Sequence, residues 1–110
     1  MEIALMADES RVAALKEILD QNPSDAFARY ALGLEYSGGG ETEEALTHFN
    51  LLLQAHPDYT NGYFMAAQTL ARAERKDEAR DMLLSGIECA QRTRNQHALA
   101  EMEGMLDELG

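Results

Sequence analysis

The chain repeats itself with a period of 34 residues, and this recurrence restricts its fold more than any other feature. When the sequence is shifted by 34 positions, residues of the same physical type meet. The matched pairs are Pro23 with Pro57, Tyr30 with Phe64, Tyr36 with Leu70, Ala45 with Ala79 and Phe49 with Leu83. A fixed period of this length is typical of proteins built from stacked repeats, each of which buries its apolar face against the next.

The composition favours helices, because alanine, leucine, glutamate and methionine are abundant and valine occurs once, at Val12. The spacing of apolar residues predicts helices at about 9–21, 25–37, 41–55, 59–73, 76–91 and 94–109. In the first helix a buried stripe is predicted from Val12, Leu15, Ile18 and Leu19. Ser24 and Asp58 each follow a proline and are predicted N-caps. The predicted fold class is all-α.

Within the period, Leu32-Gly33-x-x-Tyr36 is followed by Ala45-x-x-x-Phe49 and closed by Pro57. This pattern resembles the tetratricopeptide repeat (TPR) family, over roughly residues 9–110. The resemblance implies a right-handed superhelical stack of about six helices in antiparallel pairs, an α-solenoid forming one TPR-like domain over 1–110. Its expected parts are a half-repeat helix (9–21), repeat 1 (26–59), repeat 2 (60–93) and a capping helix (94–110). The chain departs from the family pattern at Arg29, where a large aromatic is usual, and at Gly86, where alanine is usual.

The chain is strongly acidic, with 20 acidic residues against 9 basic ones and a net charge of −11. Affinity for nucleic acids comes mostly from lysine and arginine, so we expect no nucleic acid partner and no anionic membrane partner. Residues 1–7 lack the basic start and long apolar run of a secretory signal, and no later stretch is long enough to cross a membrane. A cytoplasmic location is therefore expected. These first residues hold too few apolar positions to define a helix face, so they either extend the first helix or lie apart from it.

Patterns of catalytic and cofactor-binding residues are missing from the sequence. The triplet Gly38-Gly39-Gly40 is followed by Glu41 and further acids, not by the lysine and hydroxyl of a phosphate-binding loop, so a helix-ending turn is predicted there. The three histidines lack metal-ligand spacing, and Cys89 is interpreted as a small apolar residue near a helix end. We expect no enzyme activity, no cofactor and no metal.

The TPR resemblance implies that the first helix of each pair lines a concave groove. Carried over position by position, it predicts these peptide-binding residues: Phe27, Tyr30, Leu34, Asn61, Phe64, Met65, Gln68, Arg72 and Met102. Five of them would form an apolar and aromatic strip, namely Phe27, Tyr30, Leu34, Phe64 and Met65. Ser37, Asn95 and Ala98 are placed on the same wall.

Two functions are consistent with such a groove. The first hypothesis is a non-enzymatic scaffold that binds an apolar peptide or helix of a partner protein. The alternative is a self-associating structural or assembly protein, for instance a homodimer. Its groove is occupied by another copy or by the Met1–Ala7 segment, or copies stack end to end through helices that are not fully capped. This many helices is near the lower limit for a stable stack, so self-association would add buried surface.

Overall fold

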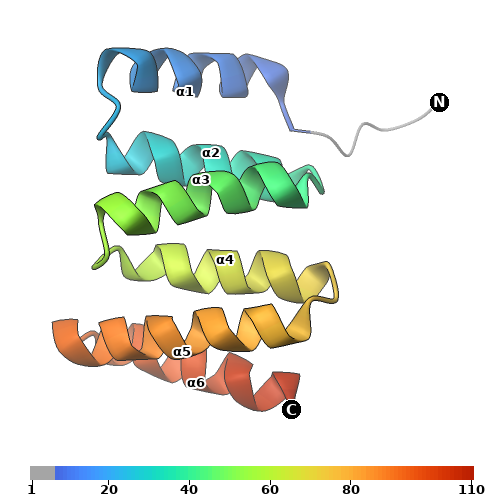
Figure 1. The fold of residues 1–110 in the computed structure, drawn as a ribbon, viewed down its shortest axis with the longest axis vertical. Coiled ribbons are helices and arrows are strands. Elements are labelled where there is room, and N and C mark those ends of the chain that lie inside the picture. Colours follow the sequence, from blue (N-terminus) through green and yellow to red (C-terminus); the bar gives the residue numbers. More distant parts are fainter. Residues whose placement is uncertain (1–6) are drawn as a thin grey trace. The chain divides into compact units, whose positions relative to one another are not determined.

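The computed structural model describes residues 7–110, and in that range it consists of six α-helices without a strand (Figure 1). The helices are α1 (Glu9–Gln21), α2 (Ala26–Gly38), α3 (Thr42–Ala55), α4 (Thr60–Arg72), α5 (Lys76–Thr93) and α6 (Gln96–Leu109). The all-α helical repeat prediction is confirmed, and the predicted helix ends differ from the observed ones by at most two residues. Apart from Ala7, the expectation for Met1–Ala7 lies outside the described residues.

The chain divides into two compact units, Met1–Ala55 with α1–α3 and His56–Gly110 with α4–α6. Within each unit, consecutive helices run antiparallel (Figure 1). The division falls in the short turn between α3 and α4. Each unit therefore consists of three helices with a core of its own.

The largest fully buried side chains of Met1–Ala55 are Phe49 and Leu52 of α3 and Leu32 of α2. A Cβ atom added at Gly33 would lie 2.5 Å from the Phe49 ring, so the missing side chain allows α2 and α3 to approach closely. The α1 stripe is narrower than predicted. Leu19 is buried, but Ile18 is 44% exposed, because α1 packs in this unit against α2 alone.

The core of His56–Gly110 joins all three of its helices. Its buried cluster contains Ala67 of α4, Leu83 and Ala90 of α5, and Ala98 and Met102 of α6. Half-buried residues such as Tyr63, Phe64 and Met105 pack around this cluster. The last helix is thereby fixed to α4 and α5, which places its outer face beside that of α4.

Helix N-termini are capped differently from the prediction. The N-cap of α2 is Asp25, whose side chain accepts a hydrogen bond from the Ala28 amide at 2.9 Å. The prediction for Ser24 is wrong, because the Asp25 amide donates to the Asn22 carbonyl and this turn delays the helix by one residue. The prediction for Asp58 is also wrong, since Tyr59 is the N-cap of α4.

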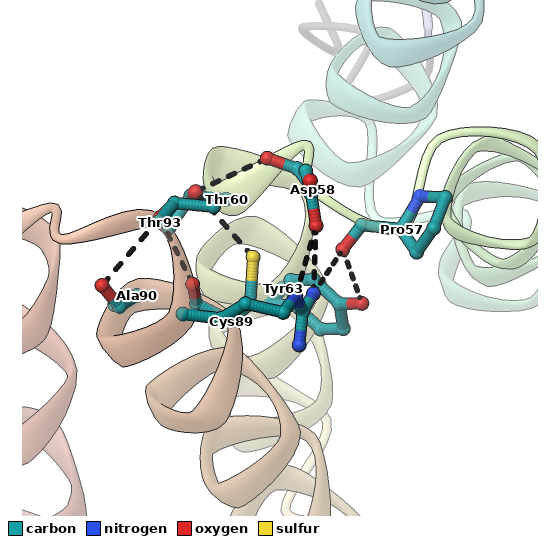
Figure 2. Close-up of polar contacts among 8 residues, drawn as sticks. Pro57, Asp58, Thr60, Tyr63, Cys89, Ala90 and Thr93 are labelled. Carbon is teal, nitrogen blue, oxygen red and sulfur yellow. Dashed lines mark hydrogen bonds and ion pairs between the residues drawn. The ribbon is translucent and has the colours of Figure 1, made fainter.

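The Asp58 carboxylate instead joins the segment before α4 to the last turn of α5 (Figure 2). It accepts two hydrogen bonds from Arg92, at 2.7 and 3.2 Å.

Two further polar contacts lie in the same region. The Tyr63 hydroxyl donates to the Pro57 carbonyl at 2.8 Å, while the thiol of Cys89 lies 3.6 Å from the Thr60 hydroxyl. Cys89 is fully buried, as its interpretation as a small apolar residue requires. Burial is the main cause that raises the pKa of Tyr63, so its hydroxyl stays a hydrogen-bond donor at neutral pH.

Three helices end in the same hydrogen-bonded turn, in which a left-handed residue is followed by an amide that reaches back five residues. The left-handed residues are Gly40 (φ 76°), Glu74 (φ 62°) and Arg94 (φ 58°). The amides that follow them donate to the carbonyls of Tyr36, Leu70 and Ala90 at 2.8–2.9 Å. These are Schellman motifs, and the predicted glycine turn after α2 is confirmed at Gly40.

Candidate functional site

An open pocket of about 520 Å³ lies between α4 and α6 in the His56–Gly110 unit. Four lining residues come from α4 and five from α6. They are Phe64, Gln68, Ala71, Arg72, Ala100, Glu101, Gly104, Met105 and Glu108. On each helix these positions are either adjacent or three to four residues apart, so each helix contributes one face.

The pocket has an apolar floor that is held in place by the core. Phe64 and Met105 are half-buried and pack against the cluster that contains Ala67, Ala98 and Met102. Their outer surfaces line the pocket. Because these side chains are anchored on the inside, the floor is preorganised to contact another apolar group.

Gly104 leaves the backbone of α6 uncovered at the pocket. A Cβ atom added there would meet nothing within 4 Å, and the residue has no left-handed φ that would require glycine. Glycine inside a helix costs about 1 kcal/mol relative to alanine. Packing and conformation within the described residues therefore give no reason for this glycine, whereas close approach of a ligand to the helix backbone would.

The rim of the pocket is polar and carries more acidic than basic groups. Glu101 and Glu108 lie on α6, and Gln68 and Arg72 on α4. Glu101 is also 3.5 Å from the imidazole of His97, a pair that is ionic only when the histidine is protonated. The sequence of α6 contains four carboxylates and neither lysine nor arginine. Its field at the pocket therefore favours a positively charged group.

The structure brings three of the predicted groove residues together in this pocket: Phe64, Gln68 and Arg72. Two others on α4, the exposed Asn61 and the half-buried Met65, are not among the lining residues. Ala71 of α4 and the five lining residues of α6, from Ala100 to Glu108, were not predicted. The signal of the α6 residues in the sequence was the four-residue spacing of Ala100 with Gly104 and of Glu101 with Met105.

The prediction that Met102 lines an exposed wall is wrong. Its side chain is completely buried, and its thioether contacts the position that a Cβ atom on Gly86 would occupy. The glycine at 86, where the repeat pattern usually has alanine, opens the space that Met102 fills. Ala98, one turn earlier, is buried in the same cluster, and Ser37 is buried as well, so neither belongs to an exposed wall.

The three predicted groove residues of α2 belong to the Met1–Ala55 unit and differ in exposure. Phe27 is 69% exposed, the highest value among the large apolar residues described. Tyr30 is half-buried, with its ring centre 6.3 Å from that of Phe49, and Leu34 is half-buried too. Of the predicted apolar strip, only Phe27 is widely exposed.

Two further properties of the described residues bear on the site. Within residues 7–110, no group of three or more His, Cys, Asp or Glu side chains is arranged to hold a metal ion. Among the same residues, none of the helices combines the length and the apolar character that a membrane span requires.

Comparisons with known proteins agree with the helical repeat architecture. Two family models described as tetratricopeptide repeat match residues 6–64 and 36–102. An uncharacterised protein of Methanocaldococcus jannaschii is 32% identical over 69 residues, which cover 63% of this chain and 80% of that protein.

Solved structures show the same similarity. A crystal structure of a tetratricopeptide repeat domain protein from Salinibacter ruber is 32% identical, with a TM-score of 0.70, over 77% of this chain and 94% of the other. A solution structure of a protein from Bordetella parapertussis is 26% identical, with a TM-score of 0.79, over 89% of this chain and 85% of the other.

Proposed function

We propose that this chain, which belongs to the tetratricopeptide repeat family, holds an apolar segment of a partner protein in the pocket between α4 and α6. Repeats of this family generally mediate protein–protein interactions, which supports an interaction module in general terms. The observation that carries the specific proposal is the apolar floor of Phe64 and Met105 beside the uncovered backbone at Gly104.

The charges of the rim define the partner further. Glu101 and Glu108 attract a lysine or arginine placed next to the apolar anchor of the incoming segment. Gln68 offers an amide that can both donate a hydrogen bond to the partner's backbone and accept one from it. The proposed ligand is therefore an apolar peptide or helix that also carries a basic residue.

The expected affinity is moderate. Burying one large apolar side chain contributes about 1.5–3 kcal/mol, from which the ordering costs of association are subtracted. A pocket of this size takes a few such side chains at most. Dissociation constants near the micromolar range are therefore expected, which suits a scaffold that binds and releases its partners.

The proposal assigns no catalytic step to the pocket. The lining residues include no serine, threonine, cysteine or histidine, so they contain no pair of a nucleophile and its imidazole base. Their chemistry is that of recognition: two carboxylates, one guanidinium, one amide and an apolar floor.

Selection from a displayed library of short peptides tests this function, because the library itself supplies the candidate ligands. We expect the wild-type protein to enrich sequences that combine leucine, isoleucine or phenylalanine with lysine or arginine. The double variant Glu101→Gln, Glu108→Gln should still enrich apolar peptides but lose the preference for basic residues. Failure to enrich any apolar sequence would contradict the proposal.

A mass measurement over a range of concentrations separates this function from self-association. The proposed module remains monomeric at micromolar concentration, with its pocket open to other proteins. If the chain instead forms a dimer that Gly104→Leu dissociates, the pocket is occupied by a second copy and the alternative replaces the proposal.

A further inference from the structure

A second pocket, of about 430 Å³, lies in the Met1–Ala55 unit and is lined by all three of its helices. Its polar lining is mainly basic, with Lys16 from α1, Arg29 from α2 and His48 from α3. Asp20 is the one acid among its lining residues, and Leu19, Pro23 and Leu32 complete the wall. Basic side chains thus converge at one point of a chain whose net charge is −11.

Arg29 keeps hydrogen-bond donors available at this pocket. Arg29 Nη1 lies 3.3 Å from His48 Nδ1, and Arg29 Nη2 donates to the Pro23 carbonyl at 3.5 Å. An arginine only donates, so His48 Nδ1 accepts and the proton of the neutral imidazole resides on Nε2. A guanidinium has five N–H groups, so donors remain after these two contacts. The His48 ring is held by stacking on Tyr36, with ring centres 5.5 Å apart.

The two permanent cations of this pocket are not held in ion pairs within the described part of the chain, although Asp20 lines the same pocket. Among residues 7–110, neither Lys16 nor Arg29 forms an ion pair with a carboxylate. The sequence has more than twice as many acids as bases, so the lack of pairing is not due to a shortage of acids. The pKa of His48 is lowered by burial and then by the charges of Arg29 and Lys16, against an opposing effect of Glu44.

The 34-residue period provides an internal control, because the equivalent positions are neutral. Thirty-four residues after Lys16, Arg29 and His48 stand Asn50 of α3, Tyr63 of α4 and Met82 of α5. The Tyr63 hydroxyl donates to the Pro57 carbonyl at 2.8 Å, as Arg29 does to the Pro23 carbonyl.

A nearby cation in the second repeat also differs in its pairing. Arg92 reaches the Pro57 carbonyl too, at 3.4 Å, but there the charge is compensated by Asp58 at 2.7 Å. In both repeats a donor at this position reaches the preceding proline carbonyl, so this contact does not by itself explain the positive charge of Arg29.

We propose that the pocket of Lys16, Arg29 and His48 is a binding site for an oxyanion, either a phosphate or a carboxylate group. The planar guanidinium of Arg29 presents donors that match two oxygens of such a group, and the Lys16 ammonium supplies a second charge. Leu19 and Leu32 accommodate the apolar part of the molecule that carries the anion. This site is separate from the α4–α6 pocket and does not depend on the function proposed for it.

Nuclear magnetic resonance titration with inorganic phosphate and, in a second series, with acetate tests the site. The ionic strength is held constant with sodium chloride, so that general screening does not change. We expect saturable shifts confined to the residues around this pocket, from one or both anions. The anion that binds more tightly identifies the class of oxyanion. Bound anion should also raise the pKa of His48, because its negative charge offsets those of Arg29 and Lys16.

The matched variant is Arg29→Tyr, which copies the second repeat by keeping a donor for the Pro23 carbonyl while removing the charge. It should weaken anion binding about tenfold or more, since a charge-assisted hydrogen bond is lost. Lys16→Gln should weaken binding by a smaller factor and leaves the hydrogen bond from Arg29 to the Pro23 carbonyl in place. This variant therefore keeps the test valid if Arg29→Tyr folds poorly. Lys76→Gln, on the exposed start of α5, is the control and should bind as wild type. Shifts that do not saturate with either anion, or unchanged binding by Lys16→Gln and a folded Arg29→Tyr, would overturn the proposal.

Discussion

At the scale of the residue, the three Schellman turns use the same backbone conformation with different side chains. Gly40 adopts its left-handed φ of 76° at little cost, because it has no Cβ atom. Glu74 adopts φ 62° at the equivalent position of the second repeat, where a side chain costs about 1–2 kcal/mol. The hydrogen bonds that follow are nearly identical, with N–O distances of 2.9 Å in both turns. The turn at Glu74 therefore has no shorter hydrogen bond that would offset the backbone strain.

The first prediction concerns these two turns. Glu74→Gly should raise the free energy of unfolding by up to about 1 kcal/mol, since removing the strain outweighs the added flexibility of the unfolded chain. Gly40→Ala should lower it by about 1 kcal/mol through backbone conformation alone, because no atom lies within 4 Å of the added Cβ. Urea denaturation measures both. Equal stability of wild type and Gly40→Ala would contradict the assignment of strain to the left-handed conformation.

The second prediction concerns the pH dependence that His48 introduces. Its pKa in the folded protein is lowered from the ordinary value of 6.5, first by burial and then by Arg29 and Lys16, so the unfolded chain binds the proton more readily. The contribution of His48 to stability is complete above pH 6.5 and is lost as the pH falls below it.

Thermal denaturation between pH 8 and pH 5 should therefore show a steeper loss of stability for wild type than for His48→Gln, which cannot take up this proton. Carboxylates titrate in both proteins and cancel in the comparison. Parallel curves would show that His48 has the same pKa in the folded and unfolded states.

At the scale of the element, the helices could be predicted almost completely from the sequence, because the 34-residue period and the apolar spacing indicate the same helices. The caps could not. Ser24 and Asp25 are both good N-cap residues, and the turn from Asn22 to Asp25, which a pattern of residue types does not contain, selects the second. The ion pair of Asp58 could not be predicted for another reason, because its partner Arg92 lies 34 residues away in the sequence.

The third prediction tests which residue caps α2. Asp25→Ala should destabilise the protein by about 1 kcal/mol, because the Ala28 amide loses its acceptor at the helix N-terminus. Ser24→Ala removes an exposed hydroxyl that donates to the Asn22 side chain but does not cap the helix, so its effect should stay within about 0.5 kcal/mol. Chemical denaturation of the two variants gives the comparison. The reverse order of stabilities would restore Ser24 as the cap.

At the scale of the whole molecule, membership of the TPR family accounts for the repeated helix pairs. The chemistry specific to this chain comes from positions where one repeat differs from the other or from the family pattern. Arg29 and Tyr63 occupy equivalent positions and bond to equivalent carbonyls, yet only Arg29 brings a charge. Gly86 departs from the usual pattern, and Met102 fills the space. Differences of this kind distinguish one member of a family from another.

The candidate site could be predicted only in part, for a physical reason. Phe64, Gln68 and Arg72 follow from the repeat frame, because α4 is a regular first helix of a pair. The face of α6 depends on how that helix rotates against α4 and α5, and Met102 entering the core sets this rotation. The rotation turns Ala98 and Met102 inward and leaves Glu101, Gly104 and Met105 at the pocket. A side chain that fills a gap on another helix is not visible in a one-dimensional pattern.

The central claim is that the α4–α6 pocket is the binding site, and Gly104 gives the most direct test of it. The measurement is the dissociation constant of a peptide selected by the wild-type protein, compared for wild type, Gly104→Ala and Gly104→Leu. Both substitutions improve helix propensity by up to about 1 kcal/mol, and a Cβ atom at this position meets nothing within 4 Å, so neither should unfold α6. The account predicts that Gly104→Ala binds nearly as wild type, whereas Gly104→Leu, which fills the pocket, binds at least about tenfold more weakly. Wild-type affinity in a folded Gly104→Leu variant would contradict it.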